Sequence, residues 1–143
     1  MHSLLDGALN RRAALIADLS RNATDAWRVI SGTADGLEGV YLDVLGDVAV
    51  LQVQEARFRV DISPVGPWAL EHLGVKSVFL KRFPANRSAI SPLLDAKAWV
   101  GSDPSSDPLR FSISEYGVKF EVRPCEGFSY GLMVNFARRL SRR

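Results

Sequence analysis

The chain has 143 residues, of which 47% are hydrophobic and 24% charged, the composition of one globular domain with its own core. No apolar run reaches the roughly 18 residues that a membrane-spanning helix needs, so we expect no membrane partner. Acidic and basic residues interrupt the first leucines, which argues against a signal peptide. A single cysteine, Cys125, excludes an intramolecular disulfide and favours a cytoplasmic location.

The positive charge is concentrated at the C-terminal end. The whole chain carries 18 basic and 16 acidic residues. Leaving out Arg138, Arg139, Arg142 and Arg143 gives 14 basic residues against the same 16 acidic ones, a net charge of −2. A local arginine cluster favours phosphate groups and so indicates a nucleic-acid partner. A solubilising terminus without a ligand is the alternative interpretation.

The first expected element is an amphipathic helix over Ser3–Arg21. Its apolar residues recur every three or four positions and define one buried stripe, whereas Arg11 and Arg12 lie off that stripe. Ser3 is a suitable N-cap, and Asp6 three residues later resembles a capping box. The stripe consists of Leu5, Leu9, Ala13, Ile16 and Leu19.

Three strands are expected next, over Trp27–Ile30, Val40–Leu45 and Val48–Val53. The dipeptide Gly46-Asp47 joins the last two strands, and glycine at the first position of a two-residue connection is typical of a type II′ hairpin. Apolar residues occupy both faces of the third strand. We therefore expect the sheet to be buried on both sides.

The second half of the chain predicts one short helix, one further strand and a second hairpin. The helix begins after Ser63-Pro64, the strand covers Ser77–Phe83, and the hairpin turns at Tyr116-Gly117. Residues 84–108 are rich in proline, serine and aspartate and predict a long surface loop. The pattern indicates an α+β fold, with a mixed, largely antiparallel sheet of hairpins, an N-terminal helix and one short packed helix.

No common catalytic or metal-binding motif is present. The two histidines and one cysteine show no metal-ligand spacing, and no nucleotide-binding or hydrolase signature occurs. Two glycine turns, DGLEG from Asp35 and EGFSYG from Glu126, leave backbone amides open to an anion or a cofactor carboxylate. A group of carboxylates is compatible with a cation site, but turn-forming and solvated roles fit its irregular spacing better. The group consists of Asp35, Glu38, Asp43 and Asp47.

Two segments together carry a family resemblance. The first is TDAWRVISGTADGLEGVYLDVLGDVAVLQ, from Thr24, and the second is EYGVKFEVRPCEGFSYGLMVNFARR, from Glu115. They resemble, in sequence and relative position, two motifs of the S-adenosylmethionine-dependent methyltransferases that make 5-methylcytosine in large-subunit ribosomal RNA. The two matches cover about a third of the chain.

The resemblance implies that residues 1–125 form the central α+β domain of that family and that residues 126–143 begin its methyltransferase domain. The rest of the Rossmann-like catalytic fold, with its nucleophilic cysteine, would then lie beyond Arg143. S-adenosylmethionine is the implied cofactor of the family, and the positions that would border it are Phe128, Ser129, Tyr130 and Asn135. Asn135 and Ala137 replace an aspartate and an arginine of the family. The resemblance therefore implies no catalysis, and at best weak cofactor binding, by this chain alone.

Two other functions remain open. A stand-alone RNA- or ribosome-binding module would use basic residues around Phe83 and in the C-terminal segment, because cations beside an aromatic ring suit single-stranded RNA. These basic residues are Lys81, Arg82, Arg87, Arg138 and Arg139. A protein-interaction or homodimerisation domain would use the apolar run Leu132–Val134, which in the family would pack against the catalytic domain.

Overall fold

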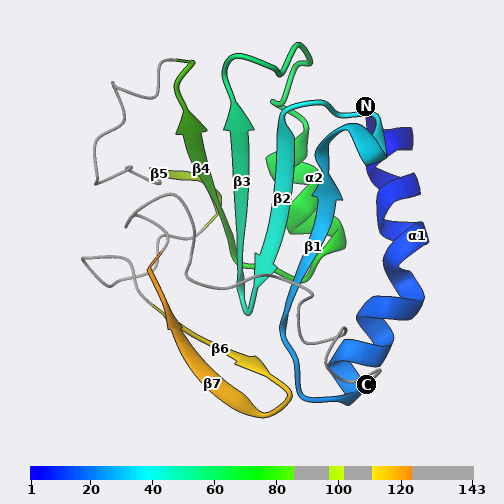
Figure 1. Cartoon of the computed structure of the whole chain (residues 1–143), viewed down its shortest axis with the longest axis vertical. Helices are drawn as coiled ribbons and strands as arrows, with labels where there is room; N and C mark the ends of the chain where they lie inside the picture. Colours follow the sequence, from blue (N-terminus) through cyan, green and yellow to red (C-terminus); the bar gives the residue numbers. More distant parts are fainter. Residues whose placement is uncertain (86–96, 102–110, 124–143) are drawn as a thin grey trace.

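The computed structural model describes residues 1–85, 97–101 and 111–123 (Figure 1). A long helix leads into a sheet, a second helix interrupts the strands, and a separate hairpin follows. The elements are α1 (His2–Arg21), β1 (Ala26–Ser31), η1 (Gly32–Asp35), β2 (Val40–Leu45), β3 (Val48–Gln54), α2 (Val65–His72), β4 (Ser77–Phe83), β5 (Lys97–Gly101), β6 (Phe111–Glu115) and β7 (Val118–Val122). Neither helix is both long and apolar enough to cross a bilayer in the part of the chain that is described.

Strands β1 to β5 form one sheet in sequential order, and β6 and β7 form a two-stranded sheet. Neighbouring strands are antiparallel except β3 and β4, which run parallel because the connection through α2 returns the chain to the same end of the sheet. Gly46 has a φ of +64° between β2 and β3, as the hairpin prediction requires. The expected α+β fold with a mixed, largely antiparallel sheet is confirmed.

The five-stranded sheet is buried on both faces. One face packs against α1 and α2 in a core that includes Leu5, Trp68 and Leu51. The opposite face packs against the β6–β7 hairpin, whose Ile113 belongs to a second cluster with Val50. Val50 and Leu51 are consecutive residues of β3, and both are fully buried. Each face of this strand is therefore covered by a different element, as its apolar character on both faces predicts.

The hairpin is attached to the sheet through the residues just before β1. Asp25 N donates to Ser114 O at 3.0 Å, and Asp25 Oδ1 accepts from Ser114 N at 2.7 Å. Thr24 Oγ1 accepts from Tyr116 N at 2.9 Å. All three bonds join residues that are 89 or 92 positions apart in sequence. The position of the hairpin against the sheet therefore depends on tertiary contacts rather than on local sequence.

The predicted cap of the first helix is wrong. The chain is helical from His2, so Ser3 lies inside α1, and Met1 occupies the N-cap position without a side-chain bond. Asp6, expected to complete a capping box, instead accepts a hydrogen bond from Trp68 Nε1 of α2 at 2.9 Å. The indole N–H of a buried tryptophan needs an acceptor, and Asp6 supplies it between the two helices.

The surface loop expected over residues 84–108 contains a strand. Lys97–Gly101 form β5 at the edge of the sheet, antiparallel to β4. The sequence alternates too little here to indicate a strand by itself. The segment becomes a strand because β4 lies beside it, since the preference of a segment for strand structure depends strongly on its neighbours in the sheet.

Gly39, in the turn before β2, lies against the backbone of the loop that follows β3. Its φ is +75°, and a Cβ there would lie 2.7 Å from Phe58 N. Gly74 has a similar φ of +65° but no heavy atom within 4 Å of its would-be Cβ. We expect Gly39→Ala to be less stable than Gly74→Ala by at least about 1 kcal/mol, because only the first adds a clash to the backbone strain. Urea unfolding of both variants measures this difference, and equal losses would contradict it.

Candidate functional site

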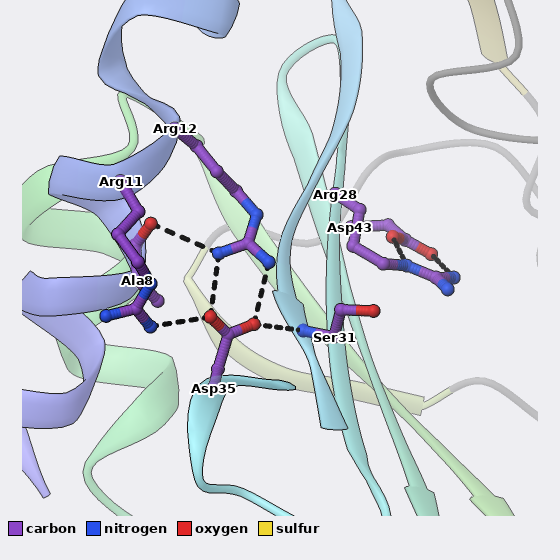
Figure 2. Close-up of polar contacts among 7 residues, drawn as sticks. All are labelled: Ala8, Arg11, Arg12, Arg28, Ser31, Asp35 and Asp43. Atoms are coloured by element: carbon purple, nitrogen blue, oxygen red, sulfur yellow. Dashed lines mark hydrogen bonds and ion pairs between the residues drawn. The ribbon is translucent and has the colours of Figure 1, made fainter. Parts of the chain in front are cut away.

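Asp35, in the DGLEG turn, is the centre of a buried polar network (Figure 2). Its side chain is 1% exposed. Arg12 donates to both carboxylate oxygens at 2.8 Å, Arg11 Nη2 donates at 2.6 Å, and Ser31 N donates at 2.7 Å. Arg12 also donates to Ala8 O within its own helix at 3.2 Å. One carboxylate thus ties α1 to the end of β1.

The charge of Asp35 is strongly stabilised. Burial by itself would raise the pKa of this carboxyl group, but the hydrogen bonds from Arg12, Arg11 and Ser31 N outweigh burial and lower the pKa from 3.8 to about 2. Its four acceptor contacts leave little room for a metal ion or substrate. The DGLEG turn is therefore a structural joint between helix and sheet in this chain.

A second buried carboxylate, Asp43, lies on the sheet face that also carries the hairpin. Arg28 binds it in a bidentate manner, with Nε to Oδ1 at 2.7 Å and Nη2 to Oδ2 at 2.9 Å (Figure 2). Gln52 Nε2 donates to Oδ2 at 3.0 Å, and the Arg28 guanidinium lies 5.2 Å from the centre of the Tyr41 ring. The ion pair with Arg28 offsets the free energy that it costs to remove the Asp43 carboxylate from water, which would be large for an isolated charge.

Lys81 extends the same polar face onto β4. It lies beside Gln52 in the β3–β4 register, so the polar side chains run across strands β1 to β4. The Lys81 side chain is fully buried, and its Nζ lies 5.7 Å from the centre of the Phe83 ring. Lys81 was expected to bind RNA. This burial argues against a direct contact between Lys81 and an RNA phosphate, which stays a prediction.

Arg82 points the other way from the same strand and is half-exposed. Its Nη1 lies 3.7 Å from Glu55 Oε1. Glu55 N donates to Phe83 O at 2.9 Å, which places the loop after β3 beside the end of β4. This loop also carries the exposed Arg57 and Arg59. We call Arg57, Arg59 and Arg82 the basic rim. Arg57 and Arg59 were not predicted as RNA ligands, because they are distant from Phe83 in sequence and only the fold brings their loop beside the end of β4.

The other predicted site residues lie outside the described residues. These are Arg87, Arg138 and Arg139 for RNA, Phe128, Ser129, Tyr130 and Asn135 for the cofactor, and the apolar run Leu132–Val134. Within residues 1–85, 97–101 and 111–123, no group of three or more histidine, cysteine or acidic side chains could hold a metal ion. Asp35 and Asp43, two of the four carboxylates that lie close together in sequence, are buried and held in separate arginine networks rather than solvated.

The fold occurs in larger solved proteins. The crystal structure of SMU.776, a "putative methyltransferase" complexed with SAH, matches 96% of this chain at a TM-score of 0.67 and 16% identity. A "putative SAM-dependent methyltransferase" from Streptococcus mutans matches 98% of the chain at a TM-score of 0.68 and 16% identity. The match covers 32% and 34% of those chains, so this chain spans about a third of their length. At this identity the likeness shows a shared fold. No protein-family model and no curated protein matches the sequence.

The two arginines of the Asp35 network should contribute unequally. Arg12 is 18% exposed and makes two bonds to the carboxylate, whereas Arg11 is 55% exposed and makes one. We expect Arg12→Ala to lower the free energy of unfolding by about 2 kcal/mol. Arg11→Ala should lower it by less than about 1 kcal/mol, because exposed ion pairs are screened by water. Urea unfolding of both variants at neutral pH distinguishes them, and a larger loss for Arg11→Ala would contradict the geometry.

The Asp35 network should also make the fold sensitive to acid. Because the pKa of Asp35 is about 2 in the folded chain against 3.8 ordinarily, the network stabilises the fold fully above pH 3.8. That stabilisation, about 2 kcal/mol, is lost as the pH falls towards 2. In Arg12→Ala the pKa should be lowered less. We therefore expect the stability gap between wild type and Arg12→Ala to narrow between about pH 4 and pH 2. A gap that stays constant over this range would contradict the assignment.

Proposed function

We propose that this chain is the non-catalytic central part of a S-adenosylmethionine-dependent RNA methyltransferase. The observation that supports this is the shared fold: nearly the whole chain matches about a third of two larger proteins that carry methyltransferase names. The family motifs at Thr24–Gln52 and Glu115–Arg139 point to the same group. The finer part of the proposal is that the complete enzyme makes 5-methylcytosine in large-subunit ribosomal RNA.

The described residues suit a supporting role rather than a chemical one. Asp35 and Asp43, the two buried carboxylates, are each occupied by arginine, and a general base needs a free lone pair within reach of the proton that it removes. His72 is exposed and stacks on Trp68, with ring centres 5.1 Å apart. In the proposed enzyme these residues stabilise the α+β domain, which acts as a rigid platform, and S-adenosylmethionine binds to the domain that follows.

The platform would also help to hold the RNA. The basic rim places three arginines in the loop after β3 and at the end of β4, and Arg87, Arg138 and Arg139 would add to it. Arg59 also donates to Phe58 O at 2.9 Å and to Ala56 O at 3.1 Å within its own loop. Guanidinium groups bind phosphate in a bidentate manner and are the usual cations for RNA backbones. Glu55 neutralises part of this charge, since it lies 3.7 Å from Arg82. We therefore propose that the rim positions the RNA backbone and that specificity for the target base belongs to the catalytic domain.

The size of the native protein tests the enzyme proposal directly. An antibody against this domain should detect, in the source cell, a polypeptide longer by at least on the order of 100–200 residues, one further domain. The purified 143-residue chain, incubated with ribosomal RNA and S-adenosylmethionine, should transfer no methyl group. A native band at 15.7 kDa would overturn the proposal and favour a stand-alone RNA-binding module.

The basic rim can be tested separately by RNA binding against salt. We expect the triple variant Arg57→Gln, Arg59→Gln, Arg82→Gln to bind a labelled fragment of large-subunit ribosomal RNA more weakly than wild type. The slope of log affinity against log salt should fall by about 2, since each contact to single-stranded RNA contributes about 0.7. Arg21→Gln is the matched control, because Arg21 is 74% exposed at the far end of α1. An unchanged slope in the triple variant would remove the rim from the interface.

A further inference from the structure

The outer edge of β7 has no strand partner among the described residues. β7 pairs with β6 alone, and the other side of β6 faces Thr24 and Asp25. Figure 1 draws the two strands apart from the five-stranded sheet, with β7 on the outside. An open edge presents backbone N–H and C=O groups that another strand can bind.

Two apolar side chains lie exposed on this edge strand. Val118 is 57% exposed and Phe120 is 41% exposed, and with Leu4 they are the exposed large hydrophobic residues of the described part of the chain. They share a face with Val122, which is buried against the large sheet. The apolar surface of the hairpin therefore continues past the part that the sheet covers.

The backbone of β7 directs its free groups outward at two positions. Glu115 and Val118 flank the two-residue turn Tyr116-Gly117, so their backbone groups point at each other across the hairpin. By alternation, Phe120 also faces β6, whereas the N–H and C=O groups of Lys119 and Glu121 face the open edge. The side chains of Lys119 and Glu121 are exposed.

In the sequence of β7, Val-Lys-Phe-Glu-Val, a valine stands two positions to either side of Phe120. The residues next to Phe120 on its two sides carry opposite charges, Lys119 and Glu121. We propose that β7 binds β7 of a second copy of this chain, antiparallel, with a two-fold axis at Phe120. Lys119 then lies opposite Glu121 of the second copy, and the reverse pair repeats across the axis. Phe120 meets Phe120 of the second copy, and Val118 lies opposite Val122 of the second copy.

This register satisfies backbone and side chains together. The positions whose backbone groups face the open edge, Lys119 and Glu121, become the hydrogen-bonded pairs. Phe120 falls in the non-hydrogen-bonded pair, where side chains approach most closely and aromatic contacts stabilise a sheet. A two-fold pairing uses the same surface on both copies, as closed dimers do.

The charges also exclude the competing arrangement. In a parallel, in-register pair Lys119 would face Lys119 and Glu121 would face Glu121, and like charges directly opposite each other destabilise a sheet. Charged residues on an edge usually prevent pairing, but here their opposite signs make the antiparallel pair attractive. Glu121 already contacts Arg123 at 2.6 Å, both side chains being about half-exposed, and such an exposed pair is weak enough to rearrange. The interface is one five-residue strand from each copy, so the dimer should be weak and concentration-dependent.

Charge reversal on β7 tests the dimer. Sedimentation velocity of the wild-type chain should show a monomer–dimer equilibrium with a dissociation constant below about 1 mM. Lys119→Glu and Glu121→Lys should each weaken the dimer at least about tenfold, because each places two like-charged pairs across the axis. The double variant should restore it. Lys76→Glu is the matched control, since Lys76 is 73% exposed in an ion pair with Asp47 and is not a residue of β7.

Mixing the two single variants gives the decisive result. An all-acidic edge from one variant faces an all-basic edge from the other, so an equimolar mixture should form a heterodimer at least as tight as the wild-type dimer. Circular dichroism confirms that every variant is folded. A monomeric wild type, single variants that dimerise unchanged, or a mixture that stays monomeric would each overturn the proposal. These readouts do not depend on RNA or on a methyltransferase domain, so they can fail or succeed independently of the proposed function.

Discussion

Strand β3 has apolar side chains on both faces, and the whole chain is arranged to cover them. Val50 and Leu51 are consecutive and fully buried, so neither face of the sheet can be left to water without exposing apolar surface. Helices α1 and α2 cover one face and the β6–β7 hairpin covers the other. The two buried clusters persist only if the helices stay attached to one face of the sheet and the hairpin to the other.

Polar groups just before and just after β1 hold the helix α1 and the β6–β7 hairpin against the sheet. Asp35 ties α1 to the sheet through two arginines and Ser31 N. Asp25 and Thr24 tie the hairpin to the opposite side through Ser114 N and Tyr116 N. The first of the two segments with the family resemblance thus supplies Thr24, Asp25 and Asp35 to these joints, which gives these three residues a structural role.

The described part of the chain carries two surfaces on which the proposals above rest. Its two buried carboxylates, Asp35 and Asp43, are each paired with arginine, and the two surfaces singled out above are the basic rim at one end of the sheet and the edge of β7 on the hairpin. Such a division fits a domain that positions partners for chemistry performed elsewhere. The two surfaces belong to different elements, so the proposed RNA contact and the proposed self-association would not compete for the same residues.

Local pattern determined the elements of this protein, and tertiary contacts decided what its charged residues do. The alternation of β2 and β3, the glycine at their turn and the helical period of α1 are short-range signals, so the α+β fold and most element ends could be predicted. Arg11 and Arg12 lie off the apolar stripe, and nothing in the sequence indicates that both bind Asp35, which is 24 and 23 residues away. Lys81 was predicted as an RNA ligand, and only the fold shows that its side chain is fully buried. β5 pairs with β4 although its own sequence does not indicate a strand. A charged side chain has no periodicity of its own: its partner, and therefore its role, is set by which distant residue the fold brings within reach.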